Sequence, residues 1–253
     1  MYTAVHYIKA ESLEQAWELN QKKANAILGG GCWMRLGRRK YNTLIDLSGL
    51  GLDQITPTEE GVEIGAMATL REVETSPELR ERFGTLFQDC TRHIVGVQFR
   101  NCATFGGSVN ARFGFSDILP ALLALDAQVE LYKGGLLSME EFSKMPYGRD
   151  LVLGVKLLHN GRKAVYETMR NSETDIPVLT CALSRLDGKL RCVIGARPGR
   201  AVVLEDVKEE ELVDKVRSLE FGDNMRASAR YRRHLAGVLA KRALSKLKEV
   251  EQA

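Results

Sequence analysis

Two glycine-rich segments are the parts of this sequence whose residue types and spacing are best suited to chemistry. Residues 29–31 are three glycines that directly follow the apolar run 26–28, and a glycine pair lies within residues 104–108. Glycines after a strand let the backbone turn tightly and bring several N–H donors close to one anion, such as a pyrophosphate. Neither segment has the G-x-G-x-x-G or G-x-x-x-x-G-K-[ST] spacing of the common nucleotide-binding loops. On spacing alone, a phosphate-binding role and a simple tight turn both stay open.

Other catalytic or metal-binding patterns do not occur. The five cysteines are scattered without any Cys-x-x-Cys pair, and the four histidines are isolated from one another. Zinc and iron–sulfur sites need clustered ligands, so we expect free thiols and no metal site in this chain. The sequence also contains neither the G-x-S-x-G nor the H-E-x-x-H motif. We therefore predict no catalytic side chain, and any redox group must be a bound cofactor or belong to a partner.

The composition is that of an ordinary soluble globular protein. Of the 253 residues, 44% are hydrophobic and 27% are charged, and the net charge is only +3. This charge is too small to indicate a nucleic-acid partner. No apolar run approaches the roughly 20 residues that a membrane helix needs. The N-terminus lacks the basic and apolar regions of a signal peptide, so we expect a cytoplasmic protein with no membrane partner.

The first half of the chain is expected to contain two α/β subdomains, at about residues 1–51 and 52–148. Hydrophobic patterns and capping signals predict strands at 3–8, 26–28, 43–47, 62–64 and 129–132, and helices starting at Ser12 and Thr69. A further helix is expected to start at Pro77 and to bury an apolar face that extends to Ile94. Residues 104–117 hold three glycines and little periodicity, so we expect a functional loop there.

Residues 149–253 are expected to form a separate C-terminal α+β domain. Short strand candidates alternate with turn residues, at 151–153, 164–166, 182–184, 192–194 and 201–203. Asp187-Gly188 suits the tight turn of a hairpin. Two helices follow, over about 209–219 and 224–250, and apolar residues line one face of the second.

Five stretches together resemble the FAD-binding subunit of the molybdenum hydroxylases, the family of xanthine dehydrogenase and carbon monoxide dehydrogenase. The likeness extends over essentially the whole chain, and its motifs occur in the family's order. They are residues 26–31 with 43–48 (AILGGG and TLIDLS), 64–70 (IGAMATL), 100–108 (RNCATFGGS), 116–127 (SDILPALLALDA) and 226–233 (RASARYRR).

The resemblance implies an α+β fold: a two-subdomain FAD-binding fold of the vanillyl-alcohol oxidase/PCMH type, followed by a C-terminal α+β domain with a small antiparallel sheet. FAD would bind between the two subdomains. Both glycine segments would wrap its pyrophosphate through backbone N–H groups, and Asp117 would accept hydrogen bonds from ribose or ribityl hydroxyls. Ile94 and Leu151 would supply apolar contacts. The residues that the resemblance implies for cofactor binding are Ile27, Leu28, Gly29, Gly30, Gly31, Cys32, Trp33, Met34, Ile94, Thr104, Phe105, Gly106, Gly107, Ser108, Asp117 and Leu151.

The family's function implies an oxidoreductase subunit that transfers electrons. Electrons would pass from [2Fe–2S] clusters on one partner subunit through FAD to an acceptor, which we expect to be NAD, while a molybdenum–pterin centre would reside on another partner. Three positions depart from the family's pattern: Cys32, Trp33 and Ser108. A lysine that some members carry downstream also has no clear equivalent near residues 175–178. These departures keep two alternatives open: a flavin-free structural or interaction subunit, and a standalone FAD-dependent reductase.

Overall fold

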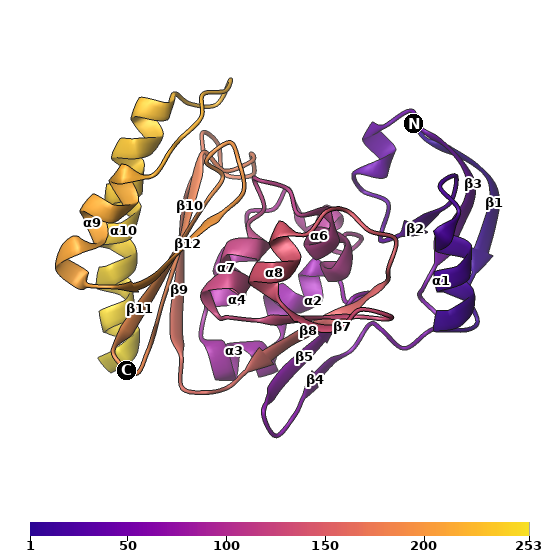
Figure 1. Cartoon of the computed structure of the whole chain (residues 1–253), viewed down its shortest axis with the longest axis horizontal. Helices are drawn as coiled ribbons and strands as arrows, with labels where there is room; N and C mark the ends of the chain where they lie inside the picture. The colour runs from indigo at the N-terminus through magenta and orange to yellow at the C-terminus, as the bar shows by residue number, and fades with distance from the viewer. Residues whose placement is uncertain (253) are drawn as a thin grey trace.

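The computed structural model describes residues 1–252 and contains three β-sheets arranged along the long axis of the molecule (Figure 1). The N-terminal sheet consists of β1 (Thr3–Lys9), β2 (Ala26–Leu28) and β3 (Lys40–Asp46), all parallel and in the order β1-β3-β2. Helix α1 (Leu13–Gln21) begins at Ser12, whose hydroxyl accepts a hydrogen bond from the Gln15 N–H at 3.1 Å. Ala16 of α1 and Ile45 of β3 are both fully buried in one cluster, so the helix covers one face of this sheet.

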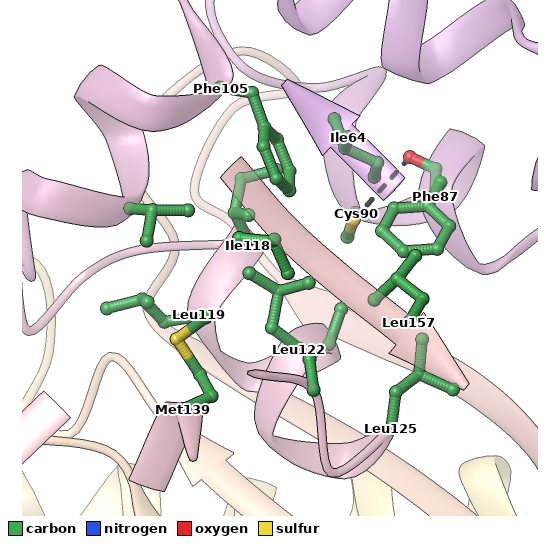
Figure 2. Close-up of a cluster of buried hydrophobic side chains, with 14 of the residues drawn as sticks. Ile64, Phe87, Cys90, Phe105, Ile118, Leu119, Leu122, Leu125, Met139 and Leu157 are labelled. Atoms are coloured by element: carbon green, nitrogen blue, oxygen red, sulfur yellow. Dashed lines mark hydrogen bonds between the residues drawn. The ribbon is translucent and has the colours of Figure 1, made fainter. Parts of the chain in front are cut away.

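The second sheet is antiparallel and forms the middle of the molecule (Figure 1). Its strands are β4 (Ile55–Pro57), β5 (Gly61–Gly65), β6 (Gln128–Leu131), β7 (Gly135–Ser138) and β8 (Val152–Leu158), in the order β4-β5-β8-β6-β7. The helices of this part are α2 (Leu70–Thr75), α3 (Pro77–Phe83), α4 (Leu86–Thr91), α5 (Val97–Arg100), α6 (Phe105–Ala111), α7 (Ile118–Ala124) and α8 (Met139–Lys144). Figure 2 shows the core between them, in which Ile64, Phe105 and Ile118 are almost fully buried.

The sheet pairing bears on the domain boundary that we predicted from the sequence. That boundary, after residue 148, assigns Val152–Leu158 to the C-terminal domain. In the structure this segment is β8, the central strand of the five-stranded sheet, which pairs with β5 and β6. A central strand supplies hydrogen bonds to neighbours on both sides, so it cannot be separated from its sheet without leaving backbone groups unpaired. We therefore propose that the C-terminal domain begins after Leu158.

The helix expected from Pro77 to Ile94 is divided in two. Helix α3 ends at Phe83, and α4 starts at Leu86. Between them Gly84 has φ +60° and ψ −136°, a non-helical conformation that glycine adopts without strain and that interrupts the helix. The prediction of a buried apolar face is nevertheless confirmed, because Leu79, Phe83, Leu86 and Phe87 are all buried.

The prediction of a loop over residues 104–117 was wrong for its first part, because Phe105–Ala111 forms helix α6. Thr104 caps this helix by accepting a hydrogen bond from the Gly107 N–H at 3.2 Å. Glycine lowers helix propensity, and this misled the sequence interpretation. Packing against Ala66 requires a glycine at position 106, because a Cβ there would lie 2.5 Å from the Cβ of Ala66.

The C-terminal sheet is an antiparallel meander of β9 (Lys163–Met169), β10 (Leu179–Leu186), β11 (Lys189–Gly195) and β12 (Val202–Val207). Asp187 and Gly188 form its predicted tight hairpin, both with positive φ. Helices α9 (Glu209–Ser218) and α10 (Ala229–Gln252) pack on one face, and α4 and α7 contact the other (Figure 1). No helix within residues 1–252 is both long enough and apolar enough to cross a membrane.

Arg232 in α10 is fully buried, which is unusual for a charged side chain. Its guanidinium donates to the carbonyl oxygens of Val178 (2.9 Å), Gly222 (2.7 Å) and Ala227 (2.7 Å) and to Oδ1 of Asn224 (2.7 Å). We predict that Arg232→Ala lowers the free energy of unfolding by about 3 kcal/mol, because several buried acceptors lose their donor. Urea unfolding measures this. Arg233→Ala is the control, since Arg233 is exposed; equal effects of the two substitutions would contradict the assignment.

Candidate functional site

A cavity of about 320 Å³ lies where three parts of the chain meet. The N-terminal subdomain supplies the first glycine segment, which follows β2. The second subdomain, which contains the five-stranded sheet, supplies α6 and the segment that leads to α7. The C-terminal domain contributes Arg170 and residues 174–177 after β9. A concave site between substructures, lined by mostly apolar groups and a few polar ones, is typical of a small-molecule or cofactor site.

Most residues that the resemblance assigns to cofactor binding line this one cavity. They are Ile27, Gly29, Gly31, Cys32, Trp33, Met34, Ile94, Thr104, Gly106, Gly107, Ser108, Asp117 and Leu151. Three others do not line it: Leu28, Gly30 and Phe105. Phe105 belongs to the hydrophobic core (Figure 2), and Gly30 packs against the backbone at Cys102. The structure thus brings both glycine segments, about 75 residues apart in the chain, to one site.

The first glycine segment offers free backbone donors. Gly30 and Gly31 have φ of +72° and +69°, conformations that only glycine adopts readily. The N–H groups of these two glycines donate no hydrogen bond to any of residues 1–252. Unpaired N–H groups in consecutive left-handed residues are suited to an anionic ligand.

The second glycine segment differs, because its N–H groups are already used. Phe105 donates to the Ala68 carbonyl at 2.7 Å, Gly106 to the Ala66 carbonyl at 2.8 Å, and Ser108 to the Thr104 carbonyl at 3.1 Å. Because glycine has no side chain, the two segments can approach each other closely. A Cβ on Gly29 would lie 2.8 Å from Thr104 Oγ1, and one on Gly107 would lie 3.3 Å from the Gly29 carbonyl oxygen. The two segments are therefore in direct backbone contact.

Asp117 lies in a buried polar cluster at the edge of the cavity. Its Oδ1 accepts a hydrogen bond from the Tyr166 hydroxyl at 2.6 Å and forms an ion pair with Arg170, which also donates to the Asp175 carbonyl oxygen. The second oxygen, Oδ2, accepts no hydrogen bond from residues 1–252, so it can receive one from a ligand. Sequence reasoning missed Arg170 and Tyr166, because nothing in a single sequence distinguishes this arginine from the other basic residues.

The pKa of Asp117 makes the stability of the protein depend on pH. Burial raises this pKa from 3.8 to about 6, because the loss of hydration outweighs the attraction of Arg170. The contribution of Asp117 to folding stability is fully present below pH ~3.8, the unfolded pKa, and is lost as the pH rises through 6. The shift corresponds to about 3 kcal/mol. We predict that the stability difference between the wild type and Asp117→Asn changes by this amount between about pH 4 and 7. Urea unfolding across this range measures it, and a pH-independent difference would contradict it.

Several other cavity residues were not predicted from the sequence. His93 lines the cavity, and its pKa is lowered by burial and by the charges of Arg92 and Arg170. Phe113 and Phe115 line it as well, beside Trp33. Residues 113–116 form a turn, in which the Ser116 N–H donates to the Phe113 carbonyl oxygen at 3.0 Å, so no periodic signal in the sequence indicated that both rings face the cavity.

The comparisons with known proteins agree with this geometry. Residues 3–157, more than half of the chain, match the family described as the FAD binding domain in molybdopterin dehydrogenase. The chain is 27% identical over 248 residues to the uncharacterized protein YgfM of Escherichia coli, with 92% of each chain covered. It is 25% identical over 274 residues to the glyceraldehyde dehydrogenase medium chain of Sulfolobus acidocaldarius, covering 95% of this chain and 97% of that protein.

Among solved structures, the chain is similar to a chain of carbon monoxide dehydrogenase from Hydrogenophaga pseudoflava. The TM-score is 0.84 at 20% sequence identity, with 96% of each chain covered. This similarity confirms the predicted α+β fold class, and the family match confirms the resemblance found in the motifs. From this match we conclude that the chain belongs to the family of FAD-binding domains of molybdopterin dehydrogenases and is an oxidoreductase subunit.

Proposed function

We propose that this chain is the FAD-binding electron-transfer subunit of a heteromeric molybdenum hydroxylase. The observation that carries the proposal is that Gly31, which lines the cavity, and the adjacent Gly30 both leave their N–H groups unpaired. When bound, FAD supplies the ability to accept and donate electrons singly or in pairs, while the protein supplies its position and electrostatic environment. No catalytic acid or base of this chain is required.

The residues of the cavity fit FAD in three ways. The first glycine segment would hold the pyrophosphate through the free N–H groups, each charge-assisted hydrogen bond contributing about 1.5–3 kcal/mol. Asp117, through its free Oδ2, would accept from a sugar or ribityl hydroxyl. Ile94 and Leu151 line the same cavity and would cover an apolar part of the cofactor.

The partner subunits and the electron acceptor are part of the same proposal. No group of three or more His, Cys, Asp or Glu side chains within residues 1–252 is placed to hold a metal ion. We propose that the molybdenum–pterin centre and the [2Fe–2S] clusters reside on two partner subunits, and that NAD accepts the electrons from FAD. The substrate would be chosen by the molybdenum subunit. Free thiols at all five cysteines are typical of a reducing compartment, and we propose a cytoplasmic location.

Reconstitution with FAD tests the proposal. We expect the purified chain to retain flavin absorption or to regain it after incubation with FAD. Absence of flavin under both conditions would contradict the proposal and favour the flavin-free subunit. Co-purification with a molybdenum subunit and an iron–sulfur subunit then distinguishes an electron-transfer subunit from a standalone reductase, which would purify alone.

A further inference from the structure

Three aromatic side chains form one cluster on the cavity wall. The ring of Trp33 lies 5.3 Å from that of Phe113 and 5.5 Å from that of Phe115, between centroids. The two phenylalanine rings are stacked, with centroids 4.9 Å apart and an angle of 14° between their planes. All three side chains line the cavity that contains the glycine segments. We call them the aromatic cluster.

The backbone on both sides holds these rings in place. Trp33 lies two residues after Gly31, the last residue of the glycine turn, and is the N-cap residue of the short 3-10 helix Met34–Leu36. Between the two phenylalanines, the Gly114 carbonyl accepts a hydrogen bond from the Ala196 N–H at 3.0 Å. A Cβ on Gly114 would lie 2.5 Å from the Gly199 carbonyl oxygen, so this segment is in close contact with the C-terminal domain.

The cluster leaves part of its aromatic surface uncovered. Trp33 is 46% exposed, although it contacts two aromatic rings. An indole that served only to pack a loop would gain more by burying both faces, since burial of apolar surface contributes about 25 cal/mol per Å².

We propose that the aromatic cluster is a stacking surface for one of the two planar ring systems of FAD, the adenine or the isoalloxazine. Planar heteroaromatic rings stack on aromatic side chains in offset or edge-on geometries. The glycine turn joins Trp33 to the proposed pyrophosphate donors, and both ring systems of FAD extend from that group. This inference rests on the proposed FAD binding and deepens it.

Trp33→Leu tests the inference and Trp33→Phe is the conservative variant. We expect Trp33→Leu to bind FAD about 2- to 10-fold more weakly, the effect of one lost aromatic pair, and Trp33→Phe to restore most of the affinity. Trp17→Phe is the matched control, because Trp17 lies on α1, contacts Lys133 and does not line the cavity. Equilibrium titration with FAD measures the affinities, and thermal unfolding checks that each variant is folded.

Flavin fluorescence and binding of the partial ligands ADP and FMN identify which ring system of FAD stacks on the aromatic cluster. Loss of affinity for ADP in Trp33→Leu assigns adenine to the cluster, whereas loss of affinity for FMN, with brighter fluorescence of the bound flavin, assigns the isoalloxazine. Unchanged FAD affinity and unchanged flavin fluorescence in Trp33→Leu would overturn the inference, and so would an equal loss in Trp33→Phe. Failure of the wild type to bind FAD is a different result, since it would contradict the proposed function itself.

Discussion

Gly30→Ala is expected to weaken FAD binding about 30-fold or more. Gly30 has φ +72°, and a Cβ there would lie 1.8 Å from the Cys102 carbonyl oxygen and 3.2 Å from the Ala103 Cα. The left-handed conformation costs a residue with a side chain about 1–2 kcal/mol, and overpacking against backbone costs about 1–3 kcal/mol more. The segment must therefore move, and its free N–H groups no longer point to one anion. Titration with FAD measures the affinity.

The chain offers a matched control for this substitution. Gly51 also has positive φ, at +70°, but a Cβ there would meet nothing within 4 Å. Gly51→Ala therefore carries the same conformational strain without the collision and lies outside the cavity lining. We expect it to lower stability by about 1 kcal/mol and to leave FAD affinity unchanged. If both variants bound FAD like the wild type, the first glycine segment would not hold the cofactor.

Asp117→Ala is expected to have the second large effect, on both stability and FAD binding. It leaves the buried Arg170 without its carboxylate, and breaking a buried ion pair by removing one partner costs about 3–5 kcal/mol. Loss of a charge-assisted hydrogen bond that a ligand hydroxyl would donate to Oδ2 should also weaken FAD binding by roughly 10–150-fold. Urea unfolding and FAD titration measure the two effects separately.

A double variant separates folding from binding. Arg170→Met combined with Asp117→Leu replaces the buried ion pair by apolar side chains, and such replacements are often neutral for stability. We expect the double variant to regain much of the stability that Asp117→Ala loses, without regaining FAD affinity. Restoration of both properties would show that Asp117 acts only in folding. The ion pair Lys156–Glu63, between partly exposed side chains, is the reference pair, for which Glu63→Ala should change stability by less than about 1 kcal/mol.

Much of the secondary structure followed from local sequence signals. The capping box at Thr69 and Glu72 is present as predicted, with hydrogen bonds of 2.7 Å and 3.1 Å between the two residues. The Asp187-Gly188 hairpin also formed as predicted. These features depend on residues close together in the chain, so their energetics can be evaluated from the sequence.

The sequence predictions differ from the structure where residues far apart in the chain determine the local conformation or the strand pairing. Glycines at 106 and 107 predicted a loop, whereas the structure has helix α6 there. Glycine is needed at 106 because the first turn of the helix lies against Ala66, where a Cβ would lie 2.5 Å from the Cβ of Ala66 and the Gly106 N–H donates to the Ala66 carbonyl oxygen. The strand after Asp150 seemed to begin a new domain, whereas its hydrogen-bond partners are β5 and β6. In each case the competing energy came from a contact with another part of the chain, which local propensity does not contain.

The sequence by itself determined the family, the fold class and the two glycine segments, because these depend on motifs read in order and on local backbone preference. Only the tertiary structure decided how the segments divide their roles. Gly30 and Gly31 keep their N–H groups free, while the second segment uses its own to hold α6 in place. It also placed Arg170 and the aromatic cluster around the cavity and Tyr166 behind Asp117, to which it donates a hydrogen bond. Burial and hydrogen-bond pairing are properties of the folded arrangement, so the partners of Asp117 cannot be inferred from positions 49 and 53 residues away.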